Sequence, residues 1–106
     1  MTQCEKILVL MIRRYHTQKV FRASDFMPPQ IGFNDECFVG YEASARMSDV
    51  ASDYPDLVET GKDGRFRTLR LRIDNLGVAL PKLNPQLRQL LIEEMLEHGV
   101  RPEYQV

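Results

Sequence analysis

Residues 39–74 constrain the fold more than any other part of the chain, because a helical pattern runs directly into two short strands. Four residues recur at the spacing of one helical face: Ala43, Met47, Val50 and Tyr54. Pro55 follows them and marks the end of the helix. Residues 57–60 are typical of a strand, residues 61–64 of a turn and residues 65–73 of a returning strand. We therefore expect a helix that leads into an antiparallel hairpin.

The expected hairpin carries an unequal share of the charge. Five basic residues and one acidic residue lie between positions 61 and 73, namely Lys62, Arg65, Arg67, Arg70, Arg72 and Asp63. The segment has a net charge of +4 in a chain of net charge -1, so the remainder carries -5. A basic element on an acidic body is a surface that a phosphate backbone can contact. Arginines on the water-facing side of a hairpin give the same pattern, and the sequence leaves both interpretations open.

The N-terminal segment predicts a central helix. Thr2 and Glu5 have the spacing of a capping box, in which each side chain accepts a hydrogen bond from the other residue's backbone. Six apolar residues follow without a break at positions 7–12. We expect a helix from Thr2 to about residue 16 that is buried on most of its circumference.

The next segment is expected to be short and irregular. Residues 17–22 are typical of an extended link or a minor strand, and Ser24 is expected to cap a brief second helix. Prolines end that helix, and residues 28–39 are predicted to form a loop. Three apolar residues are expected to anchor this loop to the core: Ile31, Phe33 and Phe38.

The C-terminal segment predicts a connector at residues 75–83 and a helix at residues 84–99, where Asn84 and Pro85 give the start and Gly99 the stop. The apolar arc of this helix is wider than one packed surface requires. We expect it to form a homodimer contact through four residues: Leu87, Ile92, Met95 and Leu96. The alternative is that the helix folds back and buries both of its apolar sides in a monomer.

Length and composition limit the remaining possibilities. A chain of 106 residues, 43% of them hydrophobic, suits one compact domain. Cys4 and Cys37 lack metal-ligand spacing, so we expect free thiols and no metal site. No apolar run has the length of a membrane span, and we expect a cytoplasmic protein without a membrane contact. No catalytic motif is present, so neither an enzyme nor a cofactor is expected.

The order of these elements resembles a winged helix-turn-helix domain, in particular small regulators of phage or prophage type. The resemblance is most specific at residues 44–50, SARMSDV, followed by Tyr54, Pro55 and the strand LVE at residues 57–59. It implies an α+β, mostly α fold with three helices, a two-stranded β-hairpin wing and an added C-terminal helix. The winged-helix domain would cover residues 1–74.

The resemblance also implies a DNA-binding transcriptional regulator that acts on double-stranded DNA as a dimer. The third helix would enter the major groove, with Arg46 near a phosphate and the residues nearest base edges being Tyr41, Glu42, Ser44, Ala45 and Ser48. The wing would contact the backbone through Lys62, Arg65 and Arg67. Glu42 and Asp49 depart from this pattern, because they place negative charge on the groove-facing helix. They favour the alternative of a winged-helix module that binds a protein and not DNA.

Overall fold

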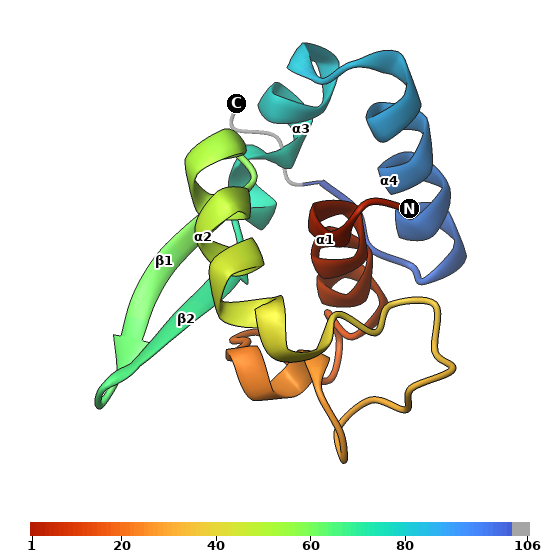
Figure 1. The fold of residues 1–106 in the computed structure, drawn as a ribbon. Coiled ribbons are helices and arrows are strands. Elements are labelled where there is room, and N and C mark those ends of the chain that lie inside the picture. The colour runs from red at the N-terminus through yellow and green to blue at the C-terminus, as the bar shows by residue number, and fades with distance from the viewer. Residues whose placement is uncertain (103–106) are drawn as a thin grey trace.

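The computed structural model describes residues 1–102 of the chain as an α+β fold (Figure 1). These residues form four α-helices and one two-stranded antiparallel sheet: α1 (Gln3–Arg13), α2 (Ala43–Asp53), β1 (Val58–Asp63), β2 (Phe66–Leu71), α3 (Leu76–Ala79) and α4 (Pro85–Glu97). Short 3₁₀ helices lie between them: η1 (Ala23–Phe26), η2 (Gly40–Glu42), η3 (Ile73–Asn75) and η4 (Leu80–Lys82). This mixture of helices and one hairpin agrees with the expected fold class at the level of α+β.

Helix α1 is the centre of the core. The backbone N–H of Glu5 donates to Thr2 Oγ1 over 3.1 Å, and the N–H of Thr2 donates to Glu5 Oε1 over 2.6 Å, so the expected capping box is confirmed. Residues 7–12 are all buried, and α1 lies between α2 and α4 (Figure 1). The helix ends at Arg13 and not near residue 16, because the chain turns at residues 14–17. This turn redirects the backbone toward the hairpin.

The link after α1 makes one backbone pairing with the hairpin. Phe21 and Leu69 exchange two hydrogen bonds of 2.9 Å in an isolated bridge, as the expected minor strand requires. The brief second helix is only the 3₁₀ turn η1, and Ser24 does not cap it. Instead, the backbone N–H of Arg22 donates to the Asp25 carboxylate over 2.7 Å. The start of η1 therefore lies two residues earlier than the position of Ser24 indicates.

The loop at residues 28–39 is held to the core by Ile31 and Cys37, which are buried, and by Phe38, which is partly buried. The expectation for Phe33 was wrong, because its side chain is 73% exposed. The Phe33 ring packs on Phe38, with 5.1 Å between ring centroids, and not on the core.

Helix α2 and the hairpin follow the expected order with a shifted turn. Ala43, Met47 and Val50 are buried, which confirms the predicted apolar stripe. The strands continue past residue 61, because Asp63 pairs with Phe66 and leaves a two-residue loop of Gly64 and Arg65. The expected turn at residues 61–64 was therefore placed two residues too early. Gly64 has φ +62, which is the left-handed conformation that the first position of a type II′ turn requires.

Gly61 lies inside β1, opposite Thr68. A Cβ atom at Gly61 would lie 3.0 Å from Thr68 Oγ1, so the close approach of that side chain explains this glycine.

The expected connector is itself helical. Leu76, Ala79 and Leu80 are buried, and they lie on α3 and η4. Their i, i+3, i+4 spacing is the sequence signal that the expectation of a connector overlooked.

Helix α4 begins and ends as predicted, with Asn84 as its cap and Gly99 just beyond it at φ +66. Its residues Leu87, Leu91 and Met95 belong to the same core as α1. This placement corrects two of the expected dimer contacts, because Leu87 and Met95 are used within the chain. Ile92 is partly buried, and Leu96 is exposed. No helix formed by residues 1–102 is long and apolar enough to cross a membrane.

Candidate functional site

A groove of about 680 Å³ lies between η1, the N-terminal half of α2 and the hairpin. Six charged or hydroxyl-bearing residues line it: Arg22, Ser24, Ser44, Lys62, Arg65 and Arg67. Its apolar lining comes from Ala23, Met27, Met47 and Phe66. The structure therefore brings four of the eight predicted DNA-binding residues, Ser44, Lys62, Arg65 and Arg67, into one concave surface.

The pleat of the hairpin explains why basic side chains form one wall of this groove. Val58 pairs with Leu71, Thr60 with Leu69, and Lys62 with Arg67, so these pairs share one face of the sheet. The apolar members of this face are buried against the core. Lys62 and Arg67 continue the same face beyond the edge of the core, where they are exposed. The alternation that packs the hairpin thus also directs two cations toward α2.

Helix α2 forms the opposite wall through Ser44 and Met47, and Ser48 lies one turn after Ser44. Arg67 Nη1 donates to the Ser48 hydroxyl, which ties the hairpin to the helix. Ser48 Oγ also lies 3.3 Å from the carbonyl oxygen of Ser44 and donates to it. Ser48 is therefore the link between the hairpin wall and the helix wall, while Ser44 lines the groove directly.

The η1 end of the groove contains an arginine that the sequence did not single out. Arg22 forms an ion pair with Asp63 at the tip of β1, and its guanidinium carbon lies 5.2 Å from the centroid of the Phe66 ring. The bridge between Phe21 and Leu69 brings Arg22 to this position. The contact of Arg22 with Asp63 joins residues 41 apart in the chain. The only sequence signal for it is the strand-like pattern of the segment that ends at Arg22.

The other predicted helix residues lie outside the groove lining. Tyr41 is fully exposed on η2, just before α2, and Ala45 is exposed one turn later on α2. Arg46 Nε lies 3.1 Å from Asp49 Oδ2 in an ion pair along the helix. The acidic charge of Asp49 on this face is thus accompanied by a guanidinium within the same turn.

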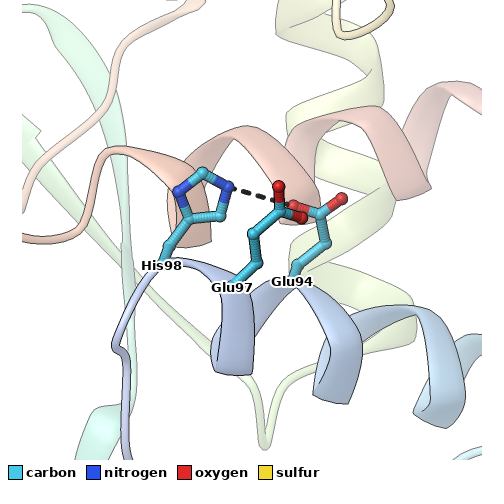
Figure 2. A group of neighbouring side chains, drawn as sticks. All are labelled: Glu94, Glu97 and His98. Carbon is cyan, nitrogen blue, oxygen red and sulfur yellow. Dashed lines mark ion pairs between the residues drawn. The ribbon is translucent and has the colours of Figure 1, made fainter.

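A second cluster of polar residues lies on the last turn of α4, where Glu94, Glu97 and His98 place ligand-type atoms within 4.8 Å of one another (Figure 2). The Glu94 carboxylate is already bound on both oxygens. It accepts from Arg13 Nε over 2.9 Å and from Arg13 Nη2 over 2.8 Å, and His98 Nε2 lies 3.5 Å away. A bidentate guanidinium satisfies the carboxylate and repels a cation, so we assign this cluster to the packing of α1 on α4.

The electrostatics of Arg13 and Glu94 agree with this assignment. The hydrogen bonds from Arg13 lower the pKa of Glu94, although burial opposes the shift. Glu94 in turn raises the pKa of Arg13, and Glu36 on the loop adds an exposed ion pair to the same guanidinium.

Both cysteines are free, as expected. Burial raises the pKa of the Cys37 thiol to about 11, although Arg13 Nη1 lies 3.7 Å from its sulfur. A thiol with this pKa is a poor nucleophile at neutral pH. Cys37 is therefore part of the core and not a reactive group.

Comparisons with known proteins matched no family model, no curated protein and no solved structure.

Proposed function

We propose that this chain is a small winged-helix protein that binds double-stranded DNA, as a transcriptional regulator and as a homodimer. The observation that carries the proposal is the convergence of Lys62, Arg65 and Arg67 on one groove beside the exposed start of α2. A duplex offers such a surface a run of phosphates next to a major groove that admits a helix.

The order of elements supports the winged-helix interpretation. Helix α1 is followed by the bridge at Phe21, the turn η1, helix α2 and the hairpin. In this interpretation α2 takes the place of the third helix, and the hairpin takes the place of the wing. The basic face of the hairpin would then lie along the phosphates while α2 faces the bases.

The hairpin and the segment of η2 and α2 would contribute differently to binding. Lys62 and Arg65 are exposed, and no ion pair joins either of them to another residue in the part of the chain that the structure describes. They would supply affinity that does not depend on sequence. Tyr41, Ser44 and Ala45 would supply hydroxyl and apolar contacts at base edges, where the nature of the group selects the base.

Salt-dependent binding to a random-sequence duplex tests the proposal. Fluorescence anisotropy with a labelled duplex should give an affinity that falls steeply and linearly on logarithmic axes as NaCl rises. Changing Lys62 and Arg65 together to alanine should weaken all duplexes similarly. It should also flatten the salt slope by about one to two units, because two phosphate contacts are lost.

A double change of Lys19 and Lys82 to alanine is the matched control, since both side chains are exposed and neither lines the groove. It removes the same charge and should leave the slope of the parent protein unchanged. Equal flattening by both double variants would show that net charge alone attracts the duplex. Binding that does not respond to salt would remove the DNA proposal.

A protein-binding module is the second candidate, and one observation favours it. The Tyr41 side chain is 100% exposed, and it lines an apolar hollow of about 200 Å³ together with Phe33, Phe38, Met27 and Pro28. Exposed aromatic side chains beside a hollow are typical of protein interfaces. If this candidate is right, Tyr41→Ala should abolish binding to the partner protein. The parent protein should then show no salt-dependent binding to duplex DNA.

A further inference from the structure

An apolar groove of about 470 Å³ lies on the other side of the chain, between α3, η4 and the C-terminal half of α4. Six apolar residues form most of its lining: Leu80, Pro81, Ile92, Met95, Leu96 and Val100. This surface shares none of its lining residues with the basic groove. A partner that binds this groove would therefore be apolar, unlike the anionic partner that suits the basic groove.

The edges of this groove include apolar side chains that residues 1–102 leave exposed. Leu96 is 79% exposed on α4, and Val78 is 53% exposed on α3 beside the lining residue Gly77. A small molecule held in the groove would still leave the outer side of Leu96 in water. A protein surface that covers both the groove and Leu96 would bury all of this apolar area.

The charges around the groove make the surface complementary to itself. Arg88 is part of the lining, one helical turn before Ile92, and Arg101 is a second cation of the lining. Glu93 is exposed and lies one turn before Leu96, on the side of α4 away from the core. Among residues 1–102, neither Arg88 nor Glu93 forms an ion pair. Each copy thus has an apolar groove with a cation at its edge and, nearby, a leucine accompanied by a carboxylate.

From this self-complementarity we infer that the occupant is a second copy of the chain. Leu96 of each copy enters the groove of the other, and Glu93 of each copy meets Arg88 of the other. A two-fold axis makes both contacts occur twice, which is the rule for a closed homodimer. The inference deepens the homodimer of the proposed function. It assigns the contact to Arg88, Ile92, Glu93 and Leu96, and it excludes Leu87, which is buried in its own chain.

Sedimentation equilibrium of the whole chain, without DNA, tests the apolar part of this interface. The parent protein should be a dimer at micromolar concentration. Leu96→Asp should be a folded monomer, because a carboxylate placed in an apolar groove loses its hydration. Val20→Asp is the control, since Val20 is also an exposed apolar residue, at 46%, and lies outside the lining of the groove. It should remain a dimer.

Charge reversal tests the polar part, and it does so on exposed or partly exposed side chains whose replacement leaves the core intact. Arg88→Glu and Glu93→Arg should each raise the dimer dissociation constant about tenfold or more, because like charges then face each other. The double variant should recover most of the loss. Recovery distinguishes a direct contact from a general effect of charge on the chain.

Three results would overturn the inference: a monomeric parent, a Leu96→Asp variant as dimeric as the parent, or a double charge reversal without recovery. Each is obtained without DNA, so it leaves the DNA proposal standing. Conversely, salt-independent DNA binding by a protein that still dimerises would remove the DNA proposal and keep the interface. Monomeric Leu96→Asp should retain the steep salt dependence on random duplex, because the basic groove is unchanged.

Discussion

Arg13 and Arg22 both form ion pairs with a carboxylate, but in regions that differ in their contact with water. The pair of Arg13 and Glu94 joins α1 to α4, and its side chains are 26% and 10% exposed. The pair of Arg22 and Asp63 joins the link before η1 to the hairpin tip, and its side chains are 43% and 58% exposed. A buried pair is costly to break because each charge would lose its main partner where water can replace that partner only in part. An exposed pair can be exchanged for water or for a ligand at little cost.

This difference separates the arginine that holds the fold from the arginines that are available to a ligand. Arg13 is held to its carboxylate by two hydrogen bonds, which outweigh the cost of burying its charge. Arg22, Arg65 and Arg67 lie around an open groove, and a phosphate could replace the present partners of Arg22 and Arg67. The comparison predicts that changes at the first region alter stability, whereas changes at the second alter binding.

The largest effect is expected from Glu94→Gln. This change keeps the size of the side chain but leaves the Arg13 guanidinium without its main counter-charge. We expect the free energy of unfolding to fall by about 2 to 3 kcal/mol, below the usual cost for a fully buried pair because Arg13 is partly exposed. Urea unfolding followed by circular dichroism measures the change.

Glu36→Gln is the control for this prediction. Glu36 pairs with the same guanidinium, but its side chain is 61% exposed. We expect the free energy of unfolding to change by less than about 0.5 kcal/mol. Equal losses from the two variants would contradict the distinction between the buried and the exposed pair.

The acid response of stability is a second test of the buried pair. Because the pKa of Glu94 is lowered in the folded state, the unfolded chain takes up its proton first as the pH falls. The contribution of Glu94 is therefore fully present above the ordinary glutamate pKa of about 4.3 and is lost as the pH falls through the folded value. The stability difference between the parent and Glu94→Gln should shrink between about pH 5 and pH 3 in urea unfolding. A difference that stays constant over this range would contradict the lowered pKa.

The sequence predicted those features whose determinants are local. The capping box at Thr2 and Glu5 needs only a four-residue spacing, and the start of α4 needs only Asn84 followed by Pro85. The hairpin was predicted from its strands, but two glycines fit its turn equally well. Only the approach of Thr68 to Gly61 and the pairing of Asp63 with Phe66 decide between them.

The candidate site could be predicted only where its residues lie on the hairpin or on α2. Lys62, Arg65 and Arg67 were found because strand alternation and charge mark them. Arg22 was not found, since it reaches the groove through the bridge between Phe21 and Leu69. Glu94 was not found either, because its partner Arg13 lies 81 residues away in the chain. Contacts of this kind arise from tertiary packing and leave no periodic signal.

A smaller effect is expected from Arg67→Ala, which removes a cation of the hairpin wall and its bond to Ser48. We expect a change of less than about 0.5 kcal/mol in unfolding, because the bond is exposed. Affinity for random duplex at low salt should fall about tenfold, with a salt slope flatter by about one unit. Ser48→Ala removes the same bond but keeps the charge, so it should bind nearly as tightly as the parent. Equal losses in both variants would show that the bond to the helix, and not the cation, matters for binding.

The smallest effect, and the one that tests the comparison most directly, is expected from Asp63→Asn. This change removes the counter-charge of Arg22 without shortening the side chain. If the exposed pair is exchangeable, stability should change by less than about 0.5 kcal/mol, while the released guanidinium becomes available to a phosphate. Affinity for random duplex should then rise a few-fold, and the salt slope should steepen by up to about one unit.

Glu59→Gln removes one negative charge from the same hairpin without touching Arg22, and it is the matched control. It should raise affinity less than Asp63→Asn, because it changes the field of the hairpin but frees no cation in the groove. Equal gains would mean that the two carboxylates act only through net charge. A loss of stability from Asp63→Asn as large as that from Glu94→Gln would mean instead that Arg22 holds the fold as Arg13 does. In that case it would not be available to a ligand.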